Sequence, residues 1–524
     1  MIINYKDKLF LEEFLQKSSD SIEMLIICKL FVATGEFLHE NIKYGAFKTI
    51  ISVMEKMGIL DQKYFNMSRS HIYILDELKK RILTEIQDEL SRFNIEDLQQ
   101  VCMKAANILS ECSVAIFEPD RIYPDVSLIK TINIISEKTN EDPKGAETQE
   151  RSSYLKQSLN LLYSQTENLN CNQGLKKVEF DEFSKLLTFE CSLIIILELR
   201  SALSSKLINI VEFNIKPLGI YSVELEKSSK VMENMLGLNE KLYAKNEDKI
   251  MKIFKSEHGF DDESIISLLN LFDGTVTMFS KTKSEMKELL QSKLRLDKKQ
   301  LDFFMNIMFF DTQGIKGNIS KVIKNVNCSI FSTPFVQNIN GNVMVNKANL
   351  IEASMYLRRR IMNEDISDRG VHPLVKKLRN EKVLPILQKN LKDAGIDSTI
   401  NKNLEEIKDL KQLLQNQKGF PHELDLYYVE NGTLKIFDLK NYMIPLSIKD
   451  VARVKKSIAK EVTKLFKLNN FIDNNKQIVK NSLKSNFDTI KYGILITNNY
   501  SPFTSYKGVQ IITVSQYLNN LVKD

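Results

Sequence analysis

Apolar residues recur three and four positions apart through most of the first 327 residues. Leu75, Leu78, Ile82 and Ile86 show this spacing, which places them on one face of an α-helix because a helix turns once every 3.6 residues. Glycine and proline are sparse in the same region. We therefore expect an α-helical N-terminal region, and its apolar stripes are more typical of a scaffold core than of a catalytic site.

One polar stretch, Thr139 to Ser153, interrupts this pattern and predicts a boundary between two helical domains, residues 1–140 and 153–327. The pattern of apolar and polar residues changes again near Pro334. From there we expect a third domain, residues 330–524.

The third domain begins with an expected hairpin and then alternates between helices and strands. Short extended runs flank Asn340-Gly341, which is a turn signal, and a basic helix follows at Asn349 to Ile361. Further helices are expected near Leu374 to Ala394, with Gly395 as a stop, and near Leu404 to Gln415. Four strands and one long helix complete the pattern: His422–Val429, Thr433–Tyr442, the helix Ser447–Phe471, Tyr492–Thr497 and Val509–Val514. This order predicts an α/β domain with a mixed sheet flanked by helices.

Composition narrows the class of protein. A hydrophobic fraction of 43% with 27% charged residues is typical of soluble globular proteins. The six cysteines stand singly and there are only five histidines, which argues against a zinc site or a disulfide framework and favours a reducing cytoplasm. The first residues do not resemble a signal peptide. The most apolar stretch, Cys191 to Leu197, is too short to cross a membrane and is expected to form a buried core helix.

Charge is unevenly distributed along the chain. Residues 366–524 contain 26 Lys and Arg against 16 Asp and Glu, a net charge of +10, whereas the whole chain carries +6. The remaining residues therefore carry −4. A basic C-terminal region indicates a polyanionic partner for that part of the protein.

Candidate chemistry gathers in the hairpin predicted around Asn431-Gly432. A two-residue turn there pairs Glu430 with Thr433 and places Asp425 directly opposite Asp438. Side chains alternate between the faces of a strand, so one face carries both aspartates with neighbouring polar side chains, and the other face is apolar.

Two opposed carboxylates repel each other unless a cation lies between them. A hard divalent cation such as Mg²⁺ or Mn²⁺ suits carboxylate oxygens, and Lys440 on the same face could orient or deprotonate a water molecule. An ordinary salt-bridged hairpin is the alternative, with Glu423 paired to Lys440.

These residues resemble the signature of the PD-(D/E)xK nuclease superfamily. Leu424-Asp425 matches its first element, with leucine in place of the proline, and Asp438-Leu439-Lys440 matches its second. The resemblance covers about Val371 to the end. It implies a restriction-endonuclease-like fold and a metal-dependent phosphodiesterase, in which Asp425 and Asp438 bind the metal and Lys440 assists the attacking water.

The superfamily usually adds a glutamate from the preceding helix. Glu381 is the candidate here, although Pro385 indicates a kink or a helix start close by. Glu423 is the alternative as the additional carboxylate and metal ligand.

The helix that follows the hairpin carries a basic stripe, and we expect it to bind a phosphate backbone unless it is an ordinary solvated face. The residues of this stripe step by three or four positions: Lys449, Arg453, Lys456, Lys460, Lys464 and Lys467.

The sequence thus predicts a Mg²⁺- or Mn²⁺-dependent endonuclease, with DNA favoured over RNA because most members of the superfamily act on DNA. The helical region is expected to regulate the domain or to bind a second copy of the chain or another protein. By analogy, this organisation suits host defence or mobile-element processing. The alternative is a non-catalytic nucleic-acid-binding or scaffolding protein with a degenerate nuclease-like domain.

Overall fold

The computed structural model describes residues 21–31, 41–58, 68–117, 146–166, 176–204, 208–216, 219–225, 244–272, 276–310, 329–362, 383–414, 422–440, 442, 448–497 and 503–521. The chain divides into two compact units. The first contains Met1–Arg200, Ile210–Val223 and Met251–Ile361, and the second contains Ser201–Asn209, Glu224–Ile250 and Met362–Asp524.

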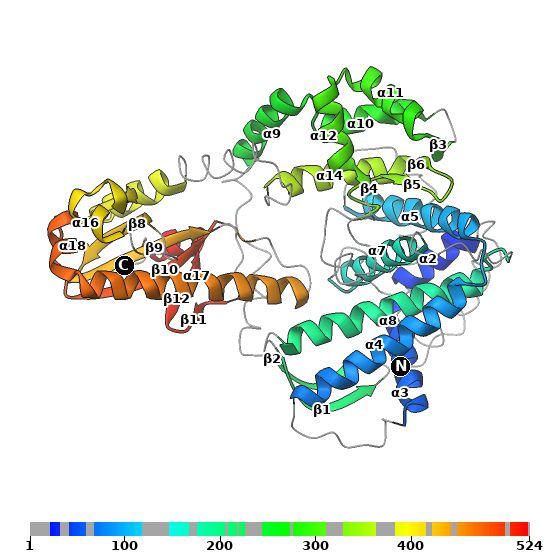
Figure 1. The fold of residues 1–524 in the computed structure, drawn as a ribbon, viewed down its shortest axis with the longest axis horizontal. Helices are drawn as coiled ribbons and strands as arrows, with labels where there is room; N and C mark the ends of the chain where they lie inside the picture. The colour runs from blue at the N-terminus through cyan, green and yellow to red at the C-terminus, as the bar shows by residue number, and fades with distance from the viewer. Residues whose placement is uncertain are drawn as a thin grey trace. The chain divides into compact units, whose positions relative to one another are not determined.

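Helices dominate the first unit (Figure 1). The helices up to residue 204 are α2 (Ser21–Phe31), α3 (Ile42–Lys56), α4 (Ser68–Leu90), α5 (Ile95–Phe117), α7 (Ala146–Thr166) and α8 (Phe180–Ser204). The four residues of the predicted α4 stripe are all fully buried, which confirms that helix and its core face. The predicted apolar helix is also confirmed, since α8 contains the stretch from Cys191 and buries most of it. No helix in the described part of the chain is both long and apolar enough to cross a membrane.

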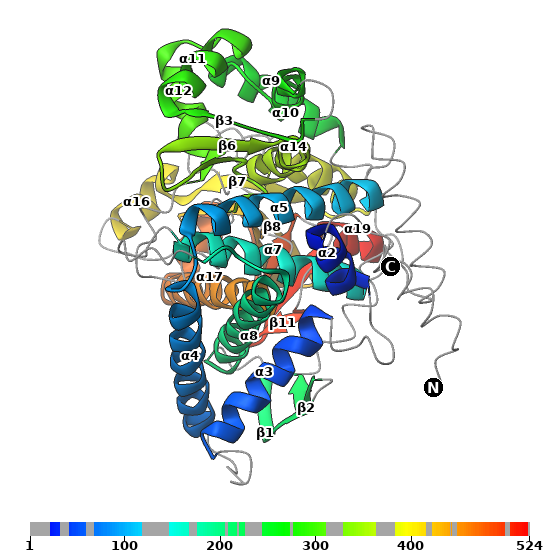
Figure 2. The same ribbon diagram turned by 90° about the vertical axis from the view of Figure 1, so that its right-hand side faces the viewer.

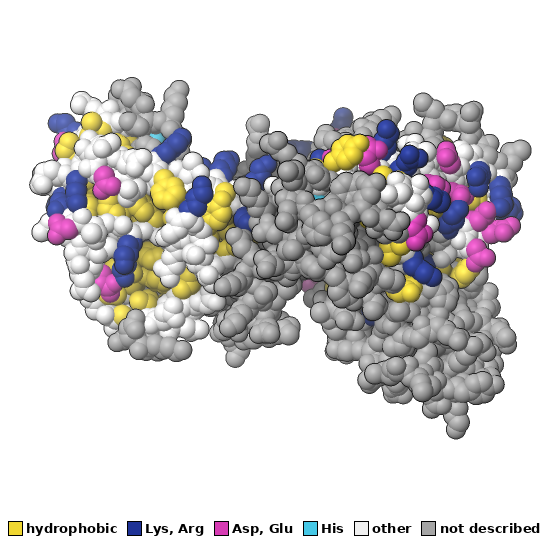
Figure 3. Space-filling view, turned by 90° about the horizontal axis from the view of Figure 1, so that it is seen from below, with side chains coloured by type: hydrophobic (Ala, Val, Ile, Leu, Met, Phe, Trp, Pro, Cys, Tyr) yellow, Lys and Arg dark blue, Asp and Glu magenta, His cyan; other side chains and the backbone are white. Residues whose placement is uncertain are grey.

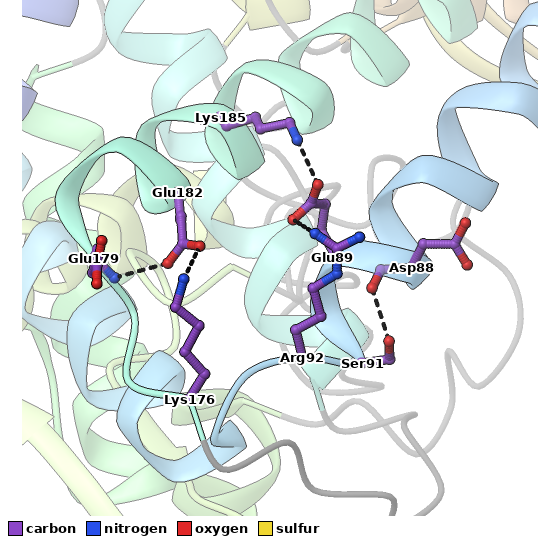
Figure 4. A network of polar contacts seen from close by, with 8 residues as sticks. All are labelled: Asp88, Glu89, Ser91, Arg92, Lys176, Glu179, Glu182 and Lys185. Carbon is purple, nitrogen blue, oxygen red and sulfur yellow. Dashed lines mark hydrogen bonds and ion pairs between the residues drawn. The ribbon is translucent and has the colours of Figure 1, made fainter.

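The helices α4 and α8 (Figures 1 and 2) are joined by ion pairs at two places along their length. Arg200 Nε lies 2.6 Å from Asp76 Oδ1, and Lys185 pairs with Glu89 near the opposite ends of the two helices. The Glu89 carboxylate also accepts a hydrogen bond from the guanidinium group of Arg92, three residues further along the chain, at 3.3 Å (Figure 4). The two helices therefore run antiparallel.

The first unit also contains strands, of which the sequence analysis expected only the two that flank Asn340-Gly341. β1 (Ile208–Lys216) and β2 (Gly219–Leu225) form a two-stranded sheet. A four-stranded sheet has the order β3-β6-β5-β4 and consists of β3 (Met278–Thr282), β4 (Phe309–Phe310), β5 (Phe335–Gln337) and β6 (Asn342–Asn346). The expected α-helical region up to residue 327 is confirmed in outline, but the strands β1 to β4 within it were not expected. β3 and β4 are too short to show an alternating pattern, and they depend on partners that come later in the chain. β1, by contrast, is rich in isoleucine and valine, a strand signal that could have been used.

The remaining helical elements before β5 are α9 (Ala244–His258), α10 (Asp262–Ser267), the 3₁₀ turn η4 (Leu268–Leu271), α11 (Lys283–Leu294) and α12 (Lys298–Met308). Three of them, α10, α11 and α12, begin at a capping box. Thr282 and Glu285 form a capping box at the start of α11, and Asp297 and Gln300 form another at the start of α12. Reciprocal side-chain bonds of this kind satisfy amides that have no partner within the helix.

The predicted hairpin around Asn340-Gly341 is confirmed, with Gly341 at a φ of 82°. This hairpin and the helix after it, α14 (Lys347–Met362), belong to the first unit, whereas the sequence placed them with the C-terminal domain. Glu352 gives the physical reason: its carboxylate accepts a hydrogen bond from Ser110 Oγ at 2.6 Å and pairs with Lys156. A buried charge set of this kind couples α14 to α5 and α7.

The expected boundary at Thr139 to Ser153 also differs from the structure. Helix α7 already begins at Ala146, and α5 and α7, on either side of that stretch, pack within one unit.

The second unit is an α/β domain with a six-stranded mixed sheet, as the sequence predicted in outline. Its elements are helix 383–393, β7 (Ser398–Asn403), η6 (Leu404–Glu406), α16 (Lys408–Leu414), β8 (Glu423–Glu430), β9 (Thr433–Lys440), α17 (Ile448–Asn474), α18 (Lys476–Leu483), β10 (Thr489–Ile496), β11 (Ser505–Tyr506), β12 (Val509–Thr513) and α19 (Val514–Leu521). The sheet order is β11-β12-β10-β9-β8-β7, with β10 parallel to both β9 and β12. Strand β7 was not predicted. Gly395 follows helix 383–393 at a φ of 76°, as expected of a stop.

The apolar face of the β8–β9 hairpin forms the core of this unit with helix 383–393 and α19. Phe437 lies at its centre, stacked near Tyr428 and edge-on to Tyr517, with ring centroids 6.1 and 5.1 Å away. Gly493 of β10 lies opposite Phe437, and a Cβ atom there would be 2.4 Å from the phenylalanine ring. The tight packing of the ring therefore requires glycine at this position.

We predict that Gly493→Ala destabilises the C-terminal unit by about 1–3 kcal/mol, because it overpacks the core against Phe437. Denaturant unfolding of the full chain, followed by hydrogen exchange of β9 and β10 amides, measures this loss. In a Phe437→Leu background the same alanine should cost much less, since the ring that it meets is gone. Additive effects of the two changes would contradict the packing argument.

Candidate functional site

The β8–β9 hairpin has the register that the sequence predicted. Asn431 and Gly432 both have positive φ, 50° and 70°, as a two-residue primed turn requires. The paired residues run from Glu430 with Thr433 to Leu426 with Phe437. The turn is also tied to β10, because the Gly432 carbonyl accepts hydrogen bonds from the Asp488 and Thr489 amides at 2.7 and 3.3 Å.

Asp425 and Asp438 lie just beyond the last recorded pair of this ladder. In a regular continuation the Leu439 amide would donate to the Leu424 carbonyl. Here it donates to Asp425 Oδ2 at 2.7 Å. The carboxylate of Asp425 is thereby held against the backbone of β9, next to the buried side chain of Asp438.

The two carboxyl groups interact strongly. Burial, and then the negative charge of Asp438, raise the pKa of Asp425 to about 7. The bond from the Leu439 amide and the charge of Lys440 act in the opposite direction. At neutral pH a proton or a cation must therefore offset the repulsion between the two aspartates.

Lys440 supplies one positive charge to this pair. Its Nζ atom lies 2.7 Å from Asp438 Oδ1 and 3.8 Å from Glu461 Oε2 of α17. Burial opposes the charge of the ammonium, but Asp438, and then Asp425 and Glu461, outweigh it and raise the pKa of Lys440. The hairpin's apolar face meets helix 383–393 and α19, so this contact places α17 on the opposite face of the sheet.

Glu461 is a carboxylate of the site that sequence reasoning missed. It lies on α17 among buried residues such as Ile458 and Val462, and both of its oxygens accept bonds from Lys464 Nζ, at 2.8 and 3.0 Å. The signal was available: Glu461 stands off the basic stripe and on the side of the helix that faces the sheet. A charged residue among apolar ones indicates a polar partner across the interface.

The other predicted carboxylates have different positions. Glu423 is half-buried and pairs through its backbone with Asn403 of β7, and the ion pairs recorded for Lys440 are with Asp438 and Glu461. The Glu423–Lys440 pair is thus absent from the ion pairs of the described residues. Glu381 lies outside the described residues.

The carboxylates of this site form a small donor set for a divalent metal. In the part of the chain that the structure describes, no group of three or more His, Cys, Asp or Glu is placed to hold a metal ion. Asp425 and Asp438 offer two carboxylates whose repulsion a cation would relieve, and Mg²⁺ commonly takes one or two protein carboxylates plus water and phosphate oxygens. The chemistry of this pair fits such an ion.

The basic stripe of α17 is partly exposed and partly used within the unit. Lys456, Lys460 and Lys467 are exposed, whereas Lys464 binds Glu461. The side chains of Lys449 and Arg453 lie outside the described residues. Figure 3 shows Lys and Arg side chains along the face of the C-terminal unit on which α17 lies in Figure 1, interspersed with apolar and a few acidic side chains.

Comparison with known proteins adds no further constraint. A scan against protein-family models, a search of curated proteins and a search of solved structures each found no match.

The raised pKa of Asp425 predicts a pH-dependent stability in metal-free solution. The unfolded carboxyl has a pKa near 4. A folded pKa of about 7 means that this residue's stabilising contribution is complete below pH 4 and is lost as the pH rises through 7. Between these values, Asp425→Asn should become progressively more stable relative to the unchanged protein. Unfolding in denaturant with a chelator at pH 4, 5.5, 7 and 8 measures the difference.

The control for this series is Glu430→Gln on the same hairpin, which removes a carboxylate that pairs with Lys435 near the surface. The free energy of unfolding of Glu430→Gln should differ from that of the unchanged protein by a nearly constant amount from pH 5.5 to 8. If Asp425→Asn shows no more pH dependence than this control, the repulsion assigned to the aspartate pair is wrong.

Proposed function

We propose that the C-terminal unit is a Mg²⁺- or Mn²⁺-dependent nuclease with a restriction-endonuclease-like fold, which hydrolyses phosphodiester bonds in nucleic acid, with DNA favoured. One observation carries the proposal: Asp425, Asp438 and Lys440 converge on one face of the hairpin, with the two carboxyl groups in mutual contact.

In this proposal the two aspartates and Lys440 have different roles. Asp425 and Asp438 would hold the ion, which when bound supplies Lewis acidity and lowers the pKa of water. The amide of Leu439 fixes the orientation of Asp425, so that carboxylate is positioned before any ligand arrives. Lys440 keeps its proton, because the surrounding carboxylates raise its pKa, and its ammonium would orient a phosphate oxygen or stabilise the developing negative charge.

The protonated state of Lys440 narrows the role expected from the sequence, which was to orient or deprotonate a water molecule. A lysine whose pKa is raised is a poor base at neutral pH, so deprotonation of water by Lys440 is disfavoured. The charge-stabilising role is the one that its surroundings support.

The exposed lysines of α17 support nucleic acid as the substrate. Lys456, Lys460 and Lys467 recur on one side of the helix and are free of the ion pairs recorded within the described residues. A row of exposed ammonium groups suits a phosphate backbone, which binds by releasing counterions and carries no base specificity.

The alternative is a non-catalytic nucleic-acid-binding domain, and one observation favours it. Lys440 already neutralises Asp438 at 2.7 Å, so the hairpin can persist without a metal. Mn²⁺ binding separates the two proposals, because a degenerate site need not bind the ion.

Asp425→Asn and Asp438→Asn should each reduce cleavage by about 10²–10³-fold or more, since each removes a charge that acts on the reacting phosphate. The assay uses linear, circular and single-stranded DNA, and RNA, with Mg²⁺ or Mn²⁺. Glu430→Gln serves as the matched control and should retain full activity. Undiminished cleavage by Asp438→Asn would assign any nuclease activity to another site.

Replacing Lys456, Lys460 and Lys467 together with glutamate should weaken binding to all sequences alike and lower the slope of log affinity against log salt by about 2–3. The matched control replaces three exposed lysines on helix 383–393 and α16, Lys389, Lys392 and Lys408, and makes the same change in net charge. Equal slopes for the two triple variants would show that only net charge matters and that α17 is not the contact surface.

A further inference from the structure

Glu461 has a position that the proposed function does not yet explain. It stands between two lysines: Lys464 binds both of its oxygens, and Lys440 lies 3.8 Å from Oε2. The side chain of Glu461 is 14% exposed and that of Asp438 is 10% exposed, so both carboxylates share a largely buried environment under α17.

Lys440 therefore has two carboxylates within reach, on two different elements. One belongs to its own strand, two residues back, and the other belongs to α17. The contact with Asp438 at 2.7 Å is the shorter, and it occupies Oδ1, one of the two oxygens that Asp438 can offer to a divalent ion. Lysine has a flexible four-carbon stem, so its ammonium can move between two acceptors a few ångströms apart.

We propose that Glu461 is a positioning residue, which accepts the Lys440 ammonium when Asp438 binds a cation and so frees Asp438 for that cation without losing Lys440 from the site. This inference rests on the proposed function, since it assigns a role in the same site. Lys464 contributes to this arrangement, because by binding both oxygens of Glu461 it fixes that carboxylate in place.

The balance of positive and negative charges at the site supports this role. A cation at Asp425 and Asp438 repels the Lys440 ammonium, and an exposed lysine would then leave for solvent. Glu461 keeps an opposite charge beside it in a partly desolvated place, where ion pairs are stronger than at a surface. Outer residues that orient a ligand of a metal site commonly change metal affinity by about 10–100-fold when they are replaced.

The test is a double-mutant cycle with Mn²⁺ alone as the probe, measured by calorimetry on the full chain without nucleic acid. We expect Glu461→Gln to weaken Mn²⁺ binding about tenfold or more, because Lys440 then stays on Asp438 and competes with the ion. In a Lys440→Met background the same change should weaken binding by less than about threefold, because no lysine needs to be moved. Glu430→Gln is the control and should bind Mn²⁺ normally.

Several outcomes overturn the proposal. An equal loss in both backgrounds would show that Glu461 acts on the ion directly or through its charge alone. No loss in either would show that it has no part in binding. Denaturant unfolding of each variant identifies any that fail to fold; Glu461→Asp, which keeps the charge, then replaces Glu461→Gln in the cycle, with a smaller loss expected and the same dependence on Lys440.

The failure of this inference can be told apart from the failure of the proposed function. If the unchanged protein binds no Mn²⁺, the metal-dependent function fails and this inference fails with it. If the unchanged protein binds Mn²⁺ and the cycle shows no coupling between Lys440 and Glu461, the inference alone is overturned.

Discussion

The positive φ angles of Asn431 and Gly432 decide which residues of β8 and β9 face each other, and the site follows from that register. A shift of one residue would move Asp438 and Lys440 to the apolar face, against helix 383–393 and α19. The same two-residue turn that gives the hairpin an apolar face for the core thus forces two aspartates together on the other face. The unit accommodates this with one backbone amide, from Leu439, and one ammonium group, from Lys440.

Local signals in the sequence were enough for this hairpin because every determinant lies within about twenty residues. The turn, the alternation of apolar and polar positions, and the spacing of Asp425, Asp438 and Lys440 can all be read from one stretch. The helix α17 was equally accessible, since its buried residues recur at helical spacing. The sequence could not predict the hydrogen bonding beyond Leu426, where the Leu439 amide donates to the Asp425 side chain and not to the backbone of β8.

Long-range pairing accounts for most of what the sequence did not show. β3 pairs with β6 although more than fifty residues separate them, and β3 by itself carries too little alternation to stand out. The position of α14 depends on Glu352 meeting Ser110 and Lys156, a choice of partner that no local pattern records. Glu461 belongs to the same category, because its role is defined by a lysine on another element. Its place among the apolar residues of α17 marked it as unusual without naming its partner.

The attachment of the Gly432 carbonyl to the start of β10 has a consequence for the order in which the unit folds. A two-residue hairpin closes fast, whereas β10 must wait for the long α17–α18 connection to be closed, at an entropic cost that grows with its length. While the hairpin stands alone, water screens its two aspartates from each other. Docking of α17 and pairing of β10 remove that water, so the repulsion arises late, after most local structure has formed. A proton or any cation that offsets the charge of the pair at that moment would lower the last folding barrier, so the final step of folding would be sensitive to pH.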